Sequence, residues 1–426
     1  MTIKKQAIEI AKKAQIASLE IANLNTDFKN EVLKEVALKI RFFKQEIIAK
    51  NHQDISLAKE NNLDAAKIDR LMLDEKRIDS LADSIESVVK LDDPVGKISY
   101  DVQRENGLHI KRVAVPIGVI LAIYESRPNV TSDIAALGFK SGNAVILRAG
   151  KESFQTSQKI AEIYQDALKK FNINPGCISY VESVDRDYVK ELLKLDKFID
   201  VVIPRGGKEL IGAIIKNTKI PVFKHLDGNC HTYIESKASL QKAIDITVNA
   251  KMRRVGICGA TESLVIDKAI AKKFLPIIIK ELNKLGCEVR GDKAVQKIAF
   301  SNHLDNSLKI SQASNIDFYT EYLDKIISVK IVKNFDEAIR HINKYSSSHT
   351  EAIITEDQNK ADEFFKKINS AIVMHNASTQ FADGGEFGLG AEVGISTGKL
   401  HARGPVGLEQ LTIYKYVVSA DCALRK

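Results

Sequence analysis

The sequence predicts an α/β protein with two doubly wound parallel-sheet domains and a small β ribbon. Between Gly118 and Ile203, short apolar runs alternate with amphipathic helical segments, the pattern of strands buried on both faces of a parallel sheet. The same alternation resumes after Ser236. Before the first run, two alternating segments flank Asn106-Gly107, which is a strong signal for a β-hairpin.

The chain before the hairpin is expected to be helical, because apolar positions recur at helical spacing and no proline occurs before Pro94. The hairpin strands are expected at 98–102 and 108–113. In the first sheet, helix 156–170 is typical of the connections, since its apolar residues share one face. The strands of that sheet are expected at 118–123, 144–147, 177–181 and 200–203.

The second domain is expected to begin near Ser236. The segment 376–407 is glycine-rich and matches neither a helix nor a strand pattern. It has two interpretations, a functional loop or a crossing segment whose glycines permit close packing. A final strand is expected at 410–418. The other elements expected here are helices at 239–250 and 269–285 and strands at 263–266, 328–332, 351–355 and 371–374.

The composition limits the partners. The 426 residues carry 63 Lys and Arg against 55 Asp and Glu, a formal net charge of +8, and these charges are interspersed. Nucleic-acid binding needs clustered basic residues, so no nucleic-acid partner is expected and small anionic ligands fit better. No apolar run could span a bilayer, and the N-terminal segment lacks the apolar region of a signal peptide, so no membrane association is expected.

The cysteine and histidine patterns limit the compartment and the cofactors. The five cysteines are an odd number without a C-x-x-C pair, which argues against a disulfide framework and favours the reducing cytoplasm. The histidines and cysteines show no metal-ligand spacing, so no metal is expected.

Cys258 is the candidate nucleophile. It lies in RRVGICGAT, between a predicted helix and a predicted strand, with two arginines and two glycines close by. Cationic neighbours favour the reactive thiolate, and glycines let a substrate approach the backbone. The alternative is a small buried core cysteine, and the local chemistry leaves both interpretations open. The other four cysteines lack this setting and are predicted to be structural.

The segment 124–130 follows the predicted strand 118–123, at the carboxyl end where parallel sheets bind ligands. Its Asn129 precedes a predicted helix and has two interpretations. One is a helix N-cap, the commoner use of such an asparagine. The other is an amide donor that stabilises an oxyanion.

Two cationic turns follow other strands of the same sheet, and the second of them opens a helix. A glycine pair at a helix N-terminus can hold phosphate oxygens, so these turns predict a ligand with several phosphates. Neither turn is a G-x-G-x-x-G fingerprint, and ordinary turn chemistry is the alternative interpretation. The candidate residues are Arg148, Lys151, Arg205, Gly206 and Gly207.

Five segments, which span nearly the whole chain, carry a resemblance. They read VAVPIGVILAIYESRPNVT, VVIPRGGKELI, HLDGNCHTYIE, VGICGATE and FADGGEFGLGAEVGISTGKLHARGPVGLEQLTIYKYVV. Together they resemble the aldehyde dehydrogenase superfamily, and within it the gamma-glutamyl phosphate reductase family. The resemblance implies a dinucleotide-binding domain of residues 1–97 and 118–235 and a catalytic domain of residues 236–408. It also implies an oligomerisation ribbon of residues 98–117 and 409–426.

The resemblance also implies a reaction and roles for the candidate residues. L-Glutamyl 5-phosphate would be reduced by NADPH to glutamate 5-semialdehyde and phosphate, a step of proline biosynthesis. Cys258 matches the family nucleophile, which forms a thioester, and Asn129 matches the side-chain donor of the oxyanion hole. Arg148 stands where aldehyde dehydrogenases usually carry a cofactor-binding lysine. Arg205, with the glycine pair after it, matches the phosphate-binding turn.

One departure from the superfamily concerns water activation. Hydrolytic aldehyde dehydrogenases carry a general-base Glu just before a Leu-Gly-Gly segment. Here the matching segment is Leu226-Asp227-Gly228, and His225 stands where that Glu would be. The absence of that Glu suits an enzyme whose thioester is cleaved by hydride or phosphate, because hydrolysis would waste it. His225 stays a candidate base, and a hydrolytic NAD(P)-dependent aldehyde dehydrogenase is the alternative reading.

The resemblance implies three kinds of partner: the acyl phosphate, further copies of the chain in a homo-oligomer, and glutamate 5-kinase, whose complex would shield the labile acyl phosphate. The groups that hold the α-amino and α-carboxylate of the substrate are sought among cationic residues near the motifs. These candidates are Arg127, His225, Lys251, Arg254, His401 and Arg403.

Overall fold

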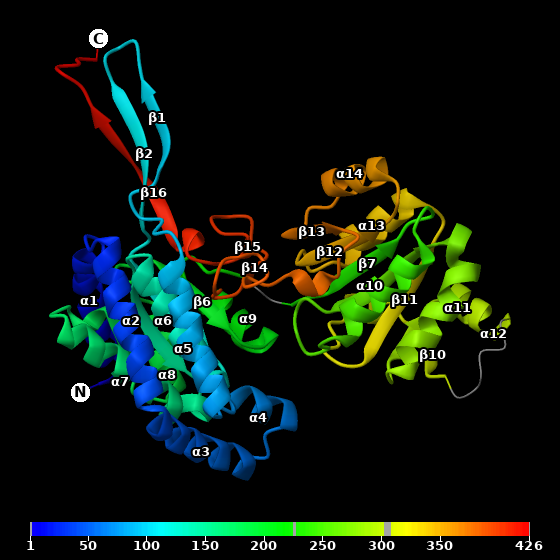
Figure 1. Ribbon diagram of the computed structural model, residues 1–426, viewed down its shortest axis with the longest axis horizontal. Coiled ribbons are helices and arrows are strands. Elements are labelled where there is room, and N and C mark those ends of the chain that lie inside the picture. Colours follow the sequence, from blue (N-terminus) through cyan, green and yellow to red (C-terminus); the bar gives the residue numbers. More distant parts are fainter. Residues whose placement is uncertain (1, 225–226, 302–307, 426) are drawn as a thin grey trace. The chain divides into compact units, whose positions relative to one another are not determined.

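The computed structural model describes residues 2–224, 227–301 and 308–425, and the chain divides into two compact units. The first unit comprises Met1–His225, Gly388–Gly394 and Leu400–Lys426. The second comprises Leu226–Phe387 and Ile395–Lys399. Each unit contains a parallel sheet, so the predicted α/β class is confirmed (Figure 1).

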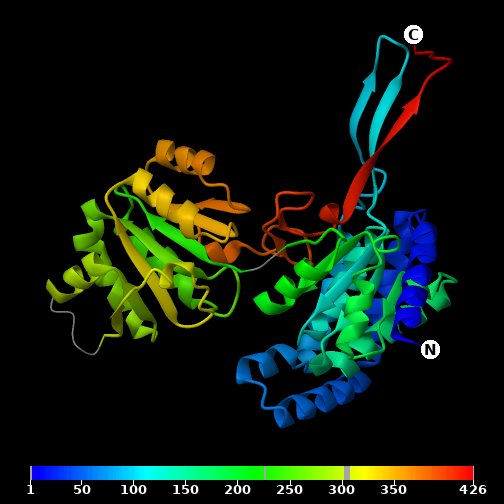
Figure 2. The same cartoon turned by 180° about the vertical axis from the view of Figure 1, so that it is seen from behind.

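The first unit is built on a parallel sheet of order β5-β4-β3-β6, covered by helices on both faces (Figures 1 and 2). Its strands are β3 (Val119–Tyr124), β4 (Ala144–Ala149), β5 (Ile178–Tyr180) and β6 (Val201–Arg205). Its helices are α1 (Ile3–Ile21), α2 (Thr26–Phe42), α3 (Lys44–Glu60), α4 (Ala65–Leu71), α5 (Glu75–Lys90), α6 (Pro128–Lys140), α7 (Phe154–Lys170), α8 (Arg186–Leu192) and α9 (Lys208–Asn217). Short 3₁₀ turns are η1 (Lys151–Ser153), η2 (Pro175–Cys177) and η5 (Glu409–Leu411).

The buried strands of this sheet explain the continuous apolar runs in the sequence. Successive residues of a strand point to opposite faces, and both faces are covered here. Ile120 and Ala122 of β3 belong to the core shared with α2, α5, α6 and α7. Leu121 and Ile123 belong to the core shared with α1, α8 and α9. The strand therefore has no solvated face, and its sequence shows no polar alternation.

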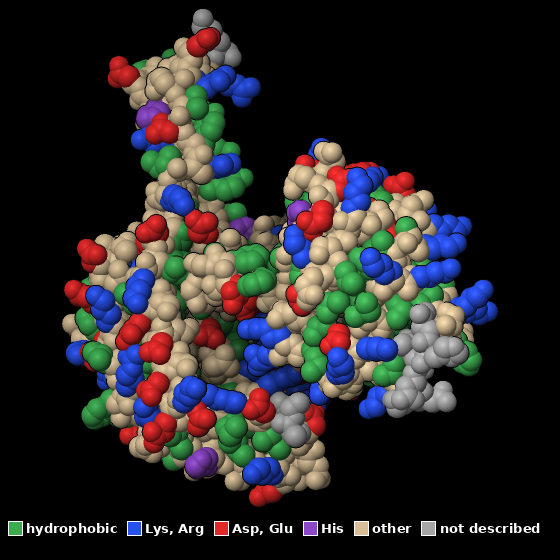
Figure 3. Space-filling view, turned by 45° about the vertical axis from the view of Figure 1, so that its right-hand side comes forward, with side chains coloured by type: hydrophobic (Ala, Val, Ile, Leu, Met, Phe, Trp, Pro, Cys, Tyr) green, Lys and Arg blue, Asp and Glu red, His purple; other side chains and the backbone are tan. Residues whose placement is uncertain are grey.

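An antiparallel ribbon extends from the first unit. It consists of β1 (Ile98–Gln103), β2 (His109–Pro116) and β16 (Thr412–Ser419), in the order β1-β2-β16. The turn at Asn106-Gly107 joins β1 to β2, with Gln103 opposite His109, so the predicted hairpin is confirmed. Apolar side chains of β16 lie exposed, and Figure 3 shows hydrophobic side chains along the ribbon.

The second unit contains a parallel sheet of order β10-β9-β11-β8-β7-β12-β13. Its apolar cores lie on both faces, one shared with α10, α11 and α12 and the other with α13 and α14. The strands are β7 (Cys230–Ile234), β8 (Thr261–Asp267), β9 (Glu288–Gly291), β10 (Ile310–Gln312), β11 (Ile326–Val332), β12 (Thr350–Ile354) and β13 (Ile372–His375). The helices are α10 (Leu240–Met252), α11 (Lys268–Lys284), α12 (Lys293–Ser301), α13 (Phe335–Tyr345) and α14 (Gln358–Lys367), with 3₁₀ turns η3 (Asp317–Tyr319) and η4 (Thr379–Phe381).

The units divide the chain differently from the expected domains. The expected boundary lay between residues 235 and 236, but β7 pairs with β8 and β12 inside the second sheet. Residues 227–235 therefore belong with the second unit. The glycine-rich segment, expected in the catalytic domain as far as residue 408, contributes 388–394 and 400–408 to the first unit. This segment also holds the two-residue strands β14 (Ile395–Ser396) and β15 (Gly404–Pro405).

No helix in the described ranges is both long enough and apolar enough to cross a membrane.

Candidate active site

Cys258 is the one partly exposed cysteine of the chain. It lies in the short connection between α10 and β8 and packs against an apolar cluster that includes Met374 and Ala382. Three other cysteines are buried, and burial raises the pKa of Cys177 and of Cys287 to about 12, so both stay protonated. Cys258 therefore differs from these three cysteines in that solvent reaches it.

The backbone of Cys258 is held by a neighbouring segment of the second unit. Gly228 lies directly against it, and a Cβ atom at residue 228 would lie 2.1 Å from the Cys258 carbonyl oxygen and 2.7 Å from its Cα. The buried Cys230 places its Sγ 3.1 Å from the same carbonyl oxygen and can donate to it. Burial raises the pKa of Cys230, so its thiol keeps the proton that this bond needs. Cys258, the candidate nucleophile, is therefore positioned through its main chain.

The segment that carries Gly228 is itself tied down. The Gly228 N–H donates to Glu321 Oε1 at 2.8 Å. The Asn229 side-chain amide donates to the carbonyl oxygens of Phe318 and Tyr345, both at 2.8 Å. Hydrogen bonds from buried donors to main-chain acceptors hold the segment in one arrangement. His225, the candidate base, lies outside the described residues.

The two cationic candidates of the second unit, Lys251 and Arg254, differ in their exposure to solvent. Lys251 is fully buried, and its Nζ pairs with the equally buried carboxylate of Glu262. The structure contradicts its assignment to substrate binding, because no substrate group can reach the ammonium. The Lys251 ammonium lies in the interior of the fold, beside Glu262. Arg254 is exposed, which leaves it available for an anionic ligand.

In the first unit, Asn129 does not cap a helix. Helix α6 begins at Pro128 with Arg127 as its N-cap residue, so Asn129 lies inside the first turn. Its Nδ2 donates to Asp133 Oδ2 at 3.1 Å, one turn further along the helix. The N-cap interpretation is therefore wrong, because proline can start the helix one residue earlier than the pattern suggests. The exposed amide keeps a second N–H for a ligand.

The predicted phosphate-binding turns share one edge of the first sheet. Tyr124 at the end of β3 is in register with Ala149 of β4 and with Arg205 of β6, so the turns that follow these strands are neighbours. Gly207 is the N-cap residue of α9, and its N–H donates to the carboxylate of Glu125 at 3.1 Å. A carboxylate thus occupies a helix N-terminus of the kind that binds phosphate.

The cationic candidates at this edge have different surroundings. Arg148 is 9% exposed, its Nη2 donates to the Val184 carbonyl at 3.0 Å, and its buried Nε has no protein partner. Lys151, in the 3₁₀ turn η1, is exposed. The guanidinium of Arg205 lies against the backbone of Gly394, where an added Cβ would lie 2.9 Å from Nη1.

His401 and Arg403 also lie in the first unit. The His401 ring stacks on Phe223 with centroids 5.6 Å apart, and its Nε2 lies 2.9 Å from the Gln410 carbonyl oxygen. Arg403 is partly buried. The His401 side chain is therefore held by residues of its own unit.

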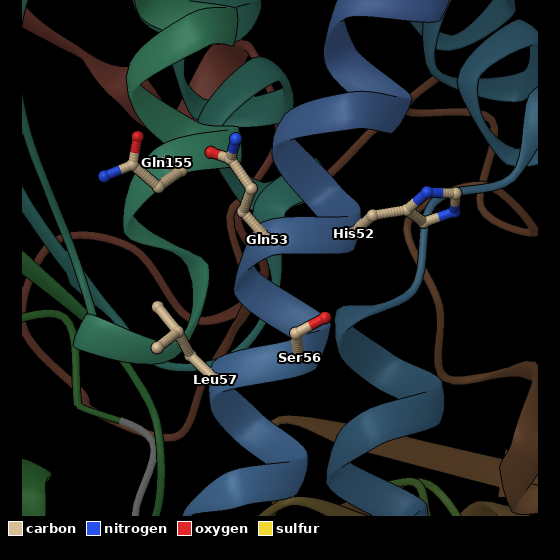
Figure 4. A pocket seen from close by; sticks show the side chains of 5 residues that line it. All are labelled: His52, Gln53, Ser56, Leu57 and Gln155. Carbon is tan, nitrogen blue, oxygen red and sulfur yellow. The ribbon is translucent and has the colours of Figure 1, made fainter.

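A hollow of about 540 Å³ in the first unit lies elsewhere, lined by His52, Gln53, Ser56, Leu57 and Gln155 of α3 and α7. Figure 4 shows the His52 ring pointing away from the amides of Gln53 and Gln155, so the lining groups do not converge. In the described ranges, no group of three or more His, Cys, Asp and Glu side chains could hold a metal ion.

The chain matches the model of the aldehyde dehydrogenase family over residues 3–313 and 318–417. A gamma-glutamyl phosphate reductase of Rhodospirillum rubrum is 49% identical over 411 residues, covering 96% of this chain and 94% of that protein. The relative of the same name from Nautilia profundicola is 45% identical and covers 98% of this chain and 100% of that protein. This chain belongs to the gamma-glutamyl phosphate reductases.

Solved structures agree with this family. The gamma-glutamyl phosphate reductase of Thermotoga maritima superposes with a TM-score of 0.94 at 43% identity, over 99% of this chain and 100% of that one. An acetylating aldehyde dehydrogenase of Geobacillus thermoglucosidasius superposes with a TM-score of 0.71 at 19% identity, over 100% of this chain and 98% of that one. The second match shows the shared fold alone.

Sequence reasoning missed the residues that position the candidates. Gly228 and Cys230 stand in the quoted HLDGNCHTYIE segment, but nothing in that pattern says which backbone they touch. Asp133 could have been found, because residues four apart on a helix are neighbours. Glu125 could not, since its bond to Gly207 spans 82 residues.

Proposed function

We propose that this chain reduces L-glutamyl 5-phosphate to L-glutamate 5-semialdehyde and phosphate, a step of proline biosynthesis, with NADPH as the electron donor. The observation that carries the proposal is its near-full-length identity of 45–49% to reductases of that name. The partly exposed Cys258 supplies the one accessible thiol outside the C-terminal tail that such chemistry needs. The hydrolytic alternative is not favoured, because these relatives are reductases of an acyl phosphate.

In the proposed mechanism, the Cys258 thiolate attacks the acyl carbon of the substrate, and phosphate leaves as the thioester forms. The main chain of Cys258 stays in place during the attack, because Gly228 lies against it and Cys230 can donate to its carbonyl oxygen. The Asn129 amide donates to the acyl oxygen as negative charge develops there. A nicotinamide dinucleotide held by Arg148, Lys151 and Arg205 would supply a hydride to the thioester carbon, and cleavage of the C–S bond would then return the Cys258 thiolate and release the aldehyde.

The phosphate-binding edge of the first unit fits a dinucleotide. The carboxylate of Glu125 at the α9 N-terminus shows that this end of the helix accepts an anion, and a Cβ at Gly207 would meet nothing within 4 Å. The buried Nε of Arg148 has a hydrogen to give and no protein acceptor. We assign Arg148, Lys151 and Arg205 to the dinucleotide phosphates, with NADPH favoured over NADH by the added 2′-phosphate.

The test is phosphate-dependent reduction of NADP⁺ by the reverse reaction, started from glutamate 5-semialdehyde. Wild-type protein is expected to need inorganic phosphate, and Cys258→Ala is expected to lose turnover while keeping its melting temperature. Cys422→Ser, which removes an exposed thiol in the C-terminal tail, is the matched control and is expected to behave as wild type. Oxidation of the aldehyde to free acid without phosphate would support the hydrolytic reading instead.

The ribbon is proposed as the contact with further copies of the chain. In the sheet order β1-β2-β16, β16 is an edge strand, so its backbone can pair with another chain. Tyr414, Tyr416 and Val418 are 49%, 59% and 52% exposed, more apolar surface than a solvated strand usually carries. Light scattering is expected to show an oligomer for the wild type and a smaller species for Tyr416→Glu.

Two further assignments follow from the chemistry. The reducing cytoplasm is the proposed compartment, because catalysis needs Cys258 as a free thiol. A complex with glutamate 5-kinase is proposed because an acyl phosphate hydrolyses in water. If the two enzymes associate, adding the kinase shifts the sedimentation of this protein, and an unshifted boundary rejects the complex.

A further inference from the structure

A partly buried carboxyl group lies one helical turn from the candidate oxyanion donor. Asp133 lies four residues after Asn129 on α6, and the Asn129 Nδ2 donates to its Oδ2 at 3.1 Å. The other oxygen, Oδ1, accepts from the Ser84 hydroxyl of α5 at 3.3 Å. Both carboxylate oxygens therefore have a donor, and these donors come from two different helices.

The geometry points to Asp133 as a positioning residue for catalysis: it fixes the rotation of the Asn129 amide so that the second N–H faces the acyl oxygen of the substrate. A primary amide carries two N–H donors and one carbonyl oxygen, and it can rotate by half a turn. A carboxylate accepts hydrogen bonds and does not donate them. The bond to Asp133 therefore excludes the rotamer in which the Asn129 amide oxygen faces this carboxylate. This inference rests on the proposed function, since it concerns the same reaction.

The surroundings of Asp133 suit this task. Burial raises the pKa of its carboxyl to about 6, against the opposing effect of the Asn129 and Ser84 hydrogen bonds and of the Arg205 charge. From α7, the Tyr164 phenol also lies close enough to sense the carboxylate. Above pH 6 the group is charged and strengthens its bond to the amide. Below pH 6 it becomes protonated, and the orientation of the amide is no longer enforced.

A double-mutant cycle tests the inference. We expect Asp133→Ala to lower kcat by about 10- to 100-fold, less than the ~10²–10³ that loss of an oxyanion donor typically costs. The dissociation constant of NADP⁺, measured by calorimetry, should change less than 3-fold. In an Asn129→Ala background the same Asp133→Ala change should have almost no effect on kcat, because the group it positions is already gone.

Two further variants separate positioning from folding. Asp133→Asn keeps the shape of the side chain but is neutral at every pH, like protonated Asp133, so its kcat should stay near the low value that wild type reaches in acid and should show no fall near pH 6. Ser84→Ala, the matched control on the other oxygen, should leave kcat within about 3-fold of wild type. Melting temperatures are recorded for each variant. If Asp133→Ala does not fold, the pH profile of kcat for Asp133→Asn decides the question.

Three results would overturn the inference. They are a wild-type kcat in Asp133→Ala, an equal loss of kcat with and without Asn129, and an Asp133→Asn pH profile identical to that of wild type. An inactive wild-type protein would instead reject the proposed function, because the cycle begins from measurable phosphate-dependent turnover.

Discussion

Replacing Gly228 with alanine should disable the enzyme by moving the backbone of Cys258, the proposed nucleophile. The new methyl carbon would lie 2.1 Å from the Cys258 carbonyl oxygen, where carbon and oxygen normally stay about 3.3 Å apart. The backbone at residue 228 and the backbone at Cys258 must therefore move apart by roughly 1.2 Å. The neighbouring atoms are main chain, and Cys230 and Glu321 hold that main chain in place.

The expected loss follows from this displacement. A 1 Å misplacement of a catalytic group can cost about 10² in rate, which corresponds to ~2.7 kcal/mol of activation free energy. Overpacking of a dense interior is expected to lower the free energy of unfolding by about 1–3 kcal/mol, which leaves a protein of this size folded. The substitution should therefore lower kcat by about 100-fold in a soluble, folded variant.

The assay combines turnover with a direct probe of the thiol. The initial rate of NADP⁺ reduction gives kcat. Mass spectrometry of the peptide that contains Cys258 gives the rate at which iodoacetamide alkylates this thiol, and it distinguishes that reaction from alkylation of the exposed Cys422. Gly212→Ala is the matched control, because a Cβ in that part of α9 meets nothing within 4 Å. It should keep wild-type kcat. A Gly228→Ala enzyme with wild-type kcat and alkylation rate would refute the positioning argument.

Three more predictions address stability and cofactor binding. Lys251→Met should lower the free energy of unfolding in urea by about 3–5 kcal/mol, because Glu262 would be left as a buried, unpaired charge. Burial lowers the pKa of His341 to about 3, so the unfolded chain binds a proton that the folded chain excludes between about pH 6.5 and pH 3. The free energy of unfolding should therefore fall as pH falls through that window, less steeply in His341→Phe. Glu125→Gln should bind NADP⁺ several-fold more tightly by calorimetry, because the charged competitor leaves Gly207.

Each of these has a contradicting outcome. Equal urea midpoints for Lys251→Met and wild type would show that the buried pair contributes nothing. Parallel stability curves for His341→Phe and wild type between pH 3 and 6.5 would assign the acid sensitivity to other groups. Weaker NADP⁺ binding by Glu125→Gln would make that carboxylate a ligand of the cofactor and not its competitor.

The sequence predicts the elements well where their pattern repeats locally. Helix 156–170 corresponds to α7, and the runs 118–123 and 144–147 correspond to β3 and β4, because burial on one or both faces imposes a period that a single segment displays. The division between residues 235 and 236 failed because β7 looks like any buried strand. Its membership in the second sheet is decided by pairing with β12, about 120 residues away, and no local pattern carries that information.

The candidate site shows the same division between local and distant information. Cys258 and the cationic turns could be singled out, since their chemistry is a property of a few consecutive residues. Lys251 was misjudged for the same reason, because a lysine near the nucleophile looks like a ligand until Glu262 is found beside it in the interior. Burial and ion pairing are properties of the packed chain, and a charged residue reveals neither from its sequence position.

The residues that make the proposed chemistry work are therefore mostly those without chemistry of their own. Gly228 contributes the absence of a side chain, and it acts by letting one backbone lie on another. Asp133 contributes a hydrogen bond that restricts the rotation of an amide. A thiol and an amide become a nucleophile and an oxyanion donor only when their positions are fixed to a fraction of an ångström, and packing from other elements does that. Substitutions at such supporting positions should thus lower kcat while leaving every chemically reactive residue in the sequence unchanged.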